Sequence, residues 1–240
     1  MGTKMDFKIE CMEIGRGTTV GAVTKDEKRS AENPSAVTEE TVSVKVKGGK
    51  GYLLVKRVFD IVAALVLGVL LLIPMLIVAL LIKLDSPGPV VFKQDRMGKD
   101  GEVFTIYKFR TMRIGAPGDV AARAFSDSDA YITRIGGLLR RSSIDELPQL
   151  INVLAGDMSI VGYRPVCLTE VEVNEMRRQL GVFSVRPGIT GLAQVSGRNT
   201  IDNEQKVQLD AQYVRECSLK MDLYCLAKTV TAVLDGEGVA

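Results

Sequence analysis

The sequence predicts an α+β protein, in which a membrane-inserted helix precedes a compact, mostly helical domain with a small β-hairpin. Three observations lead to this fold class. Residues 61–82 form an uninterrupted apolar run, residues 90–112 hold two β-rich runs around a short turn, and the rest of the chain carries helical patterns. We divide the chain into an extension (1–52), a re-entrant membrane helix (53–85) and a compact domain (86–240).

The extension is predicted from its composition. It is polar, mixed in charge and poor in aromatic residues, which is typical of a flexible segment. The whole chain has a net charge of +2, too small to indicate a nucleic-acid partner, and we expect none. It contains no histidine, which excludes Ser-His-Asp and Cys-His nucleophilic schemes and most zinc sites. Its four cysteines show no CxxC pair, as expected of a reduced, cytosol-facing domain.

The membrane helix is predicted from the apolar run at residues 61–82. A straight helix of this length spans about 33 Å, enough to cross the hydrocarbon core of a bilayer. Basic residues flank the run on both sides, among them Lys56, Arg57 and Lys83, and the positive-inside rule places both flanks in the cytoplasm. Pro74 removes a helix hydrogen bond and favours a kink. We therefore expect a re-entrant helix broken at Pro74, with a single-pass anchor as the alternative.

The compact domain is predicted to begin with a hairpin whose turn is "GKDG". A helical pattern follows at residues 144–155, and Gly156 is its expected stop. Further helices are predicted at residues 168–180, 202–217 and 221–235. A glycine-rich loop, "VRPGITGLAQVSGRN", lies between the first and second of these.

Basic residues suggest where an anion binds. In "YKFRTM", strand alternation places Lys108 and Arg110 on one face, and two neighbouring cations repel unless an anion or acid joins them. A solvated strand face is the alternative. Arginine offers paired donors that suit phosphate oxygens. Further arginines that support this interpretation are Arg140, Arg141, Arg164, Arg186 and Arg198.

The acidic pair Asp145 and Glu146, in "SSIDELPQL", has two interpretations. Ser143 and Glu146 fit a helix capping box, and Asp145 as N-cap fits Pro148 better, because the proline then falls in the first turn. Alternatively, one carboxylate attacks phosphorus while the other holds Mg²⁺. Neighbouring residues diverge by about 100° on a helix, so the two acids would have different roles. Spacing alone favours the cap.

Several motifs in order resemble one known family. They are the membrane segment with its flanks, "KRVFDIVAALVLGVLLLIPMLIVALLIKLDSPGPVVFKQDRMG", followed by "YKFRTM", "LRRSSIDELPQLINVLAGDMSIVGYRP" and "RPGITGLAQVSGRN". From about Lys56 to the C-terminus the chain is similar to bacterial sugar transferases, also called monotopic phosphoglycosyl transferases. The resemblance implies transfer of a sugar 1-phosphate from a UDP-sugar to a polyprenyl phosphate such as undecaprenyl phosphate, with release of UMP. It further implies Mg²⁺ and a catalytic domain at the cytoplasmic face of the bacterial inner membrane, where such transfer begins exopolysaccharide or glycan synthesis.

The resemblance also implies residue roles. Asp145 matches the nucleophile that forms a covalent phosphosugar intermediate, and Glu146 matches its acidic partner; both are assigned to the Mg²⁺ site. The positions assigned to substrate binding are Lys108, Arg110, Arg141, Arg164, Arg198 and Asp210. For Asp210, the alternative interpretation is an exposed acid on the surface of a helix.

The chain departs from the family pattern at two places. Ile73-Pro74 replaces the frequent Ser-Pro of the helix break, and Tyr163-Arg164-Pro165 replaces the commoner Pro-Arg-Pro. Two other functions stay open: direct transfer without a covalent intermediate, and a non-catalytic scaffold or module that binds anionic lipids through its basic strand. A homodimer is also left open.

Overall fold

The computed structural model describes residues 44, 46–116, 128–197 and 201–234. The chain divides into two units, Met1–Thr38 and Glu39–Ala240, and every described residue belongs to the second. Most of the predicted extension therefore lies outside the described residues. The elements of the second unit, in order, are α1 (Gly49–Leu70), α2 (Leu72–Asp85), β1 (Val91–Met97), η1 (Lys99–Gly101), β2 (Val103–Phe109), α3 (Ser128–Tyr131), α4 (Arg134–Ser142), η3 (Ile144–Glu146), α5 (Gln149–Ala155), β3 (Ser159–Val161), α6 (Val171–Gln179), η4 (Val182–Ser184), β4 (Gly188–Thr190), α7 (Leu192–Gly197), α8 (Asn203–Glu216) and α9 (Leu219–Leu234).

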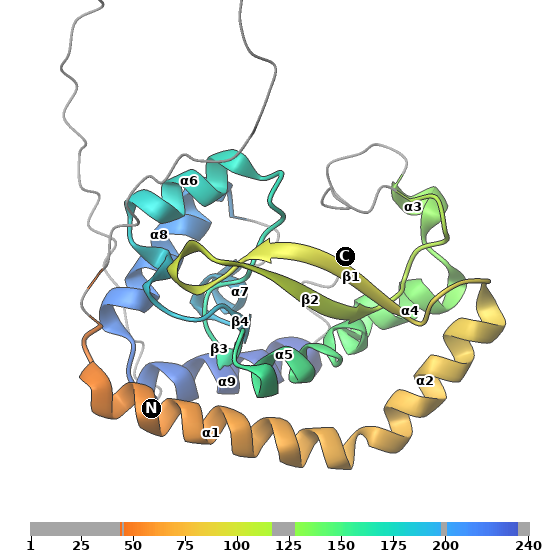
Figure 1. The fold of residues 1–240 in the computed structure, drawn as a ribbon, viewed down its shortest axis with the longest axis horizontal. Helices are drawn as coiled ribbons and strands as arrows, with labels where there is room; N and C mark the ends of the chain where they lie inside the picture. Colours follow the sequence, from red (N-terminus) through yellow and green to blue (C-terminus); the bar gives the residue numbers. More distant parts are fainter. Residues whose placement is uncertain (1–43, 45, 117–127, 198–200, 235–240) are drawn as a thin grey trace, which may run out of the picture. The chain divides into compact units, whose positions relative to one another are not determined.

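The apolar run forms two helices, α1 and α2, which meet at an angle of 62° (Figure 1). The bend lies at Leu71, three residues before the predicted break at Pro74. The difference has a steric cause. Pro74 has no N–H to donate to the carbonyl of Leu70 and its ring crowds that carbonyl, so the helix yields one turn earlier. The helix also begins at Gly49, inside the segment predicted as extension.

The α1–α2 pair has an inverted pattern of burial. Most of its large apolar side chains are exposed, whereas Asp60 is 2% exposed. The Asp60 carboxylate accepts hydrogen bonds from the Ser159 hydroxyl (3.0 Å) and the Ile160 amide (2.9 Å), which ties α1 to β3. In the described part of the chain, no helix by itself has the length and apolar character to cross a membrane; only α1 and α2 taken together, as a bent pair, meet that test.

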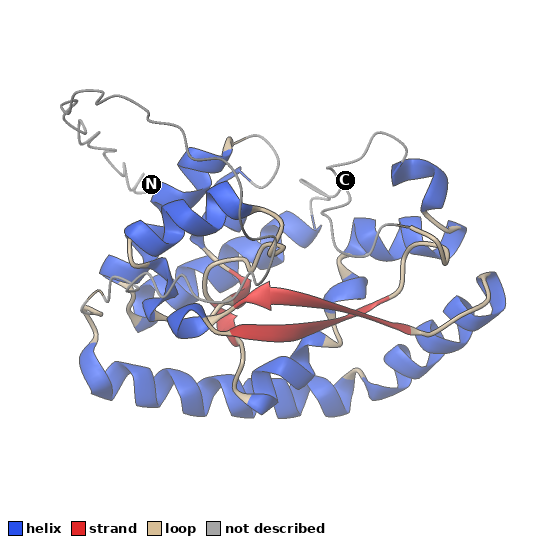
Figure 2. Cartoon of the chain, turned by 45° about the horizontal axis from the view of Figure 1, so that its top comes forward, coloured by secondary structure: helices blue, strands red, loops and turns tan. Residues whose placement is uncertain are grey.

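The predicted hairpin is confirmed. Strands β1 and β2 pair antiparallel, with Val91 opposite Phe109 and Met97 opposite Val103 (Figure 2). The turn between them contains Asp100 at φ 57° and Gly101 at φ 78°, and glycine adopts positive φ without steric cost. The prediction of a small hairpin in a mostly helical chain therefore describes this part of the fold correctly.

A second, two-stranded parallel sheet joins β3 to β4, and the sequence did not predict it. Here two glycines allow two backbones to touch. A Cβ on Gly188 would lie 2.1 Å from the amide nitrogen of Gly162, closer than any side chain tolerates. The glycines of "VGYRP" and "RPGITG" therefore bring together two loops that are distant in sequence.

The described residues pack around two hydrophobic clusters. The larger lies among β3, α5, η4, α8 and α9, and contains the fully buried rings of Tyr163, Phe183 and Tyr213. The smaller joins α2 to the end of β2 and to α4 through Ile82, Phe109 and Leu139. The hairpin thus rests between the two clusters, and its second strand leads directly to the acidic pair described next.

The helix predicted at residues 144–155 is two elements rather than one. A 3-10 turn, η3, holds the acidic pair, and α5 begins only after Pro148. Neither Ser143 nor Asp145 caps a helix with its side chain, so both capping interpretations are wrong. Gly156 ends α5 in the left-handed conformation (φ 103°), as predicted. The three later helices also form, as α6, α8 and α9, within a few residues of the predicted bounds.

Candidate active site

The centre of the candidate site is an ion pair between Lys108 on β2 and Glu146 on η3. The Lys108 Nζ donates to Glu146 Oε1 at 2.8 Å, and both side chains are less than one-fifth exposed. Strand alternation puts the Lys108 side chain on the face of β2 that η3 covers. The 3-10 turn brings Glu146 to meet it, because the chain reverses at Ser143, which is left-handed at φ 55°.

Arg164 holds Glu146 from the other side. Its two terminal nitrogens donate to Oε1 at 2.6 Å and to Oε2 at 3.2 Å, which is the paired geometry that arginine offers a carboxylate. The Arg164 side chain is 47% exposed. It is therefore accessible from solvent as well as bonded to Glu146.

These two cations decide the ionisation of Glu146. Burial disfavours the charged carboxylate, but the positive charges of Arg164 and Lys108 outweigh burial and hold the pKa of Glu146 well below its usual range. Burial in turn lowers the pKa of Lys108, against the attraction of Glu146. Glu146 is accordingly a charged anchor at neutral pH and is poorly suited to accept or donate a proton there.

Asp145 differs from Glu146 in its partners and in the direction of its pKa shift. Among the described residues, none donates a hydrogen bond to the Asp145 carboxylate or forms an ion pair with it. Burial raises the pKa of Asp145 above its usual value, while Lys108 opposes the rise. A partly desolvated carboxylate with open lone pairs is more basic and more nucleophilic than one that is held. The two adjacent acids therefore have unequal chemistry, as their divergence predicts.

Comparison with known proteins identifies the family to which this site belongs. The sequence profile described as bacterial sugar transferase matches residues 51–236. The chain belongs to the bacterial sugar transferase family. The acidic pair and both cations lie within the matched range, so the resemblance inferred from the motifs is confirmed.

Three curated relatives illustrate the range of this family. The chain is 44% identical over 188 residues to the UDP-glucose:undecaprenyl-phosphate glucose-1-phosphate transferase of Escherichia coli, covering 74% of this chain and 39% of that protein. It is 42% identical to the uncharacterized sugar transferase EpsL of Bacillus subtilis, covering 78% of this chain and 91% of that protein. It is 38% identical to the exopolysaccharide production protein ExoY of Rhizobium meliloti, covering 89% and 99%. The chain thus spans well under half of the E. coli protein and nearly all of the other two.

The two arginines before the acidic pair lie in different surroundings. Arg141 was predicted to bind substrate, but it is exposed and its Nε donates to the Gly137 carbonyl of its own helix. Arg140 is partly buried, donates from Nε to the Thr111 hydroxyl at 2.9 Å, and interacts electrostatically with Asp145. Burial lowers the pKa of Arg140 and Asp145 opposes this. The sequence named Arg140 among the arginines that suit phosphate but did not assign it to substrate binding, and the fold brings it close to Asp145.

Arg110 lies away from the acidic pair. It follows the last residue of β2 and is buried, and its guanidinium donates to the Ser86 carbonyl (2.7 Å), the Ser86 hydroxyl (2.9 Å) and the Pro87 carbonyl. These acceptors follow the end of α2. The contacts give Arg110 a structural role, because they join the end of α2 to the hairpin. Its contact with substrate stays a prediction.

Asp210 is buried and paired with an arginine. It is 1% exposed on α8 and forms an ion pair with Arg177 on α6, with 2.6 Å between Arg177 Nη2 and Asp210 Oδ2. The alternative interpretation, an exposed helix acid, is therefore wrong, and a role of Asp210 in substrate binding stays a prediction. The remaining predicted substrate residue, Arg198, lies outside the described residues.

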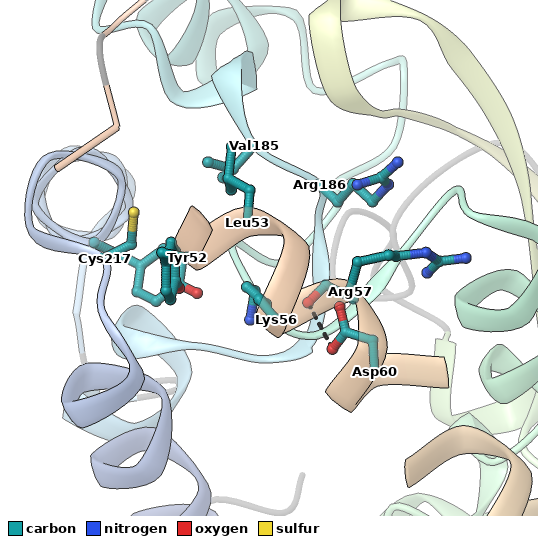
Figure 3. Close-up of a pocket in the computed structure, with 10 residues that line it drawn as sticks. Tyr52, Leu53, Lys56, Arg57, Asp60, Val185, Arg186 and Cys217 are labelled. Carbon is teal, nitrogen blue, oxygen red and sulfur yellow. Dashed lines mark hydrogen bonds between the residues drawn. The ribbon is translucent and has the colours of Figure 1, made fainter. Parts of the chain in front are cut away.

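A small cavity lies beside the first half of α1 (Figure 3). It measures about 30 Å³, which is room for a single water molecule. Two of its cations are already engaged: Arg57 donates to the Val153 carbonyl at 2.7 Å, and Arg186 donates to the Gly156 carbonyl at 2.6 Å. Val153 lies in the last turn of α5 and Gly156 is its C-cap. The Arg57 contact therefore ties α1 to α5, and the cavity itself is too small for a nucleotide sugar.

The acidic pair fits a divalent cation only together with a substrate. No group of three or more His, Cys, Asp or Glu side chains gathers anywhere in the described ranges. Mg²⁺ in phosphate chemistry commonly uses one or two carboxylates plus phosphate oxygens and water. Asp145 is open, and Glu146 accepts three hydrogen bonds of the roughly four that a carboxylate can accept. The pair can thus supply the protein share of such a site.

Proposed function

We propose that this protein transfers a sugar 1-phosphate from a UDP-sugar to undecaprenyl phosphate and releases UMP. The observation that carries the proposal is the contrast within the acidic pair: Asp145 is open and basic, while Glu146 is fixed by Lys108 and Arg164. Membership of the bacterial sugar transferase family supports it, as do relatives named for transfer of glucose 1-phosphate or N-acetylgalactosamine phosphate to undecaprenyl phosphate.

The first step is attack by an Asp145 carboxylate oxygen on the β-phosphorus of the UDP-sugar. A bond forms between that oxygen and phosphorus, and the bond from phosphorus to the bridging oxygen breaks, so UMP leaves with that oxygen and its electron pair. The product on the protein is an acyl phosphate that carries the sugar 1-phosphate. No proton has to move, which suits a site without histidine.

The second step is attack on the same phosphorus by an oxygen of undecaprenyl phosphate. The bond to Asp145 breaks and the carboxylate is regenerated, so one phosphate anhydride has been exchanged for another. Lys108 and Arg164 assist both steps, because the charge on the equatorial oxygens of phosphorus is stabilised by fixed cations in a partly buried site. Arg140 is oriented to serve the same charge from the side of α4.

Mg²⁺ is part of the proposal as a resident cofactor held by Glu146 and Asp145. When bound, it would neutralise charge on the diphosphate of the donor. The protein contributes the orientation of Glu146. Lys108 and Arg164 fix the Glu146 carboxylate, so the lone pair that accepts no hydrogen bond points in a constant direction. We expect Mg²⁺ addition to protect the peptide containing η3 from hydrogen exchange when a UDP-sugar is present, beyond the protection that the UDP-sugar gives alone. Unchanged exchange would contradict this site.

The bent pair α1–α2 is proposed as a re-entrant insertion into the cytoplasmic leaflet of the inner membrane. Its exposed apolar faces and the cations on both flanks support this position. Arg110 would then hold the end of α2 next to the strand that carries Lys108. Such an arrangement delivers a lipid-bound phosphate to the acidic pair from the membrane side.

The experiment is a UMP-release assay on the purified full chain with undecaprenyl phosphate and a panel of donors. UDP-glucose, UDP-galactose and UDP-N-acetylgalactosamine form the panel, because relatives are named for these sugars. We expect release with at least one donor, and none from Asp145→Asn. Failure of the wild type with every donor would favour a non-catalytic lipid-binding module.

A second experiment separates covalent from direct transfer. The wild type is incubated with the active donor alone, and its mass is measured intact and after proteolysis. We expect the mass of one sugar phosphate on the peptide that contains Asp145, together with about one equivalent of UMP per protein. Release of UMP only when undecaprenyl phosphate is present, without a modified peptide, would support direct transfer.

A further inference from the structure

The backbone of Arg164 is held by a second arginine, Arg177 on α6. Nη1 of Arg177 donates to the Arg164 carbonyl at 2.8 Å, and Nη2 of the same guanidinium donates to Asp210 Oδ2 at 2.6 Å. Arg177 is 3% exposed, so both bonds are shielded from water. One planar group therefore links the residue that grips Glu146 to a buried acid on α8.

The ring of Tyr163 provides a third contact for Arg177. The guanidinium carbon lies 5.2 Å from the centroid of the ring, within the range of a cation–π interaction. Tyr163 is itself fixed, because it is fully buried and meets the ring of Phe183 edge to face at 5.7 Å. Asp210 and Tyr163 thus hold Arg177 in one orientation, with its remaining donor pair aimed at the Arg164 carbonyl.

Stability alone is a weak explanation for this buried pair. Removing two charges from water is costly, and well-packed apolar residues often replace a buried ion pair with no loss of stability. The Arg177 Nε also has no hydrogen-bond partner, which adds to that cost. The contact that an apolar replacement could not reproduce is the one to the Arg164 backbone.

We propose that Arg177, anchored by Asp210 and Tyr163, is a positioning residue for Arg164. It fixes the backbone from which the Arg164 guanidinium reaches Glu146 and the phosphate oxygens of the donor. Arg96 on β1 supports the adjoining residue in the same way, donating to the Pro165 carbonyl at 3.1 Å. The inference rests on the proposed function for its kinetic consequence, whereas the restraint on the loop is independent of any reaction.

The test variant is Arg177→Lys. Lysine keeps a positive charge for Asp210, but its single ammonium on a flexible stem lacks the fixed fork that serves Asp210 and the Arg164 carbonyl together. Arg178→Lys is the matched control, because Arg178 is the next residue of α6 and its side chain pairs, within the described part of the chain, with Glu175 of its own helix alone, at 3.6 Å.

Hydrogen exchange of the peptide spanning residues 162–168 gives a readout that does not depend on activity. Arg177→Lys should increase exchange in this peptide, while Arg178→Lys leaves it unchanged. Equal exchange in the two variants would overturn the positioning role, whether or not the wild type transfers a sugar phosphate. Absence of UMP release from the wild type, with increased exchange in Arg177→Lys, would instead overturn only the proposed function.

A double-mutant cycle on kcat/KM for UMP release gives the kinetic readout. We expect Arg177→Lys to lower kcat/KM on the order of 10²-fold, the effect of a small misplacement of a reacting group. In an Arg164→Ala background the same substitution should cost less than about threefold, because the group that it positions is gone. Equal losses in both backgrounds would show a general structural effect and overturn the proposal.

Asp210→Asn is the second variant, in case Arg177→Lys does not fold. The amide keeps an oxygen that accepts from Arg177 but removes the charge that fixes the guanidinium. We expect increased exchange at residues 162–168 and a loss of kcat/KM that disappears in the Arg164→Ala background. Unchanged exchange and unchanged kcat/KM in Asp210→Asn would count against the anchoring role and overturn the inference.

Discussion

Arg164 and Glu146 form a two-point ion pair, with 2.6 Å to Oε1 and 3.2 Å to Oε2, and Lys108 shares Oε1 from the opposite side. Because burial is outweighed by the two cations, the pKa of Glu146 lies well below its usual range. A carboxyl group whose pKa is lowered on folding stabilises the native state above its unfolded pKa of about 4.3, and this contribution is lost as pH falls through the folded pKa.

Glu146→Gln is therefore expected to destabilise the fold in a pH-dependent way. The substitution leaves Lys108 buried and unpaired, and breaking such a pair costs about 3 kcal/mol in the free energy of unfolding. Denaturant titrations of both proteins at pH 7 and in steps down to pH 3 measure the difference. It should be constant near neutral pH and shrink below about pH 4. A difference independent of pH would contradict the lowered pKa.

Arg110→Met tests the structural role of Arg110. Methionine keeps much of the apolar stem but leaves the Ser86 and Pro87 carbonyls without their donor, at a cost of about 2 kcal/mol in the free energy of unfolding. We expect kcat/KM per folded molecule to stay within about threefold of the wild type. A loss much larger than this would place Arg110 on the substrate instead. Arg113→Met, at an exposed neighbouring position, serves as control for both measurements.

Local pattern nominated part of the site, and the family resemblance decided its interpretation. Alternation in "YKFRTM" selected Lys108 together with Arg110, and spacing alone favoured a helix cap for Asp145 and Glu146. The structure brings Lys108 to Glu146, because β2 and η3 meet through their ion pair. The capping interpretation failed because the left-handed Ser143 ends α4 and forces a 3-10 turn, which no helical periodicity reports.

The long-range contacts could not be predicted from the sequence, because they depend on how distant elements pack. Arg140 and Arg141 are adjacent residues of the same type, and only the packing of α4 decides which one lies near Asp145. The Arg177–Asp210 pair joins residues 33 positions apart, and both would look like ordinary solvated charges on their helices. The signal that was available is Tyr163, a departure from the family's Pro-Arg-Pro, whose ring carries the Arg177 guanidinium.

The re-entrant position of α1 and α2 predicts that both flanks are cytoplasmic. Single cysteines are introduced by Lys47→Cys and Lys93→Cys in a Cys11→Ser background, since the three described cysteines are buried and will not react. In intact cells an impermeant maleimide should label neither position, and permeabilised cells should show both. Labelling of one flank alone in intact cells would establish a single-pass anchor.

Asp145→Asn is expected to stabilise the fold while it abolishes the reaction. Burial raises the pKa of Asp145, so the native state ionises this group less readily than the unfolded chain does. The resulting cost is absent below the unfolded pKa of about 3.9 and fully present above the folded pKa. The variant should therefore unfold at a higher denaturant concentration than the wild type at pH 7, release no UMP, and lose its stability advantage as the pH approaches 4. Asp100→Asn, on the exposed hairpin turn, should change neither property. A variant less stable than the wild type at pH 7 would mean that the attraction of Lys108 and the neighbouring arginines exceeds the cost of burying the Asp145 carboxylate.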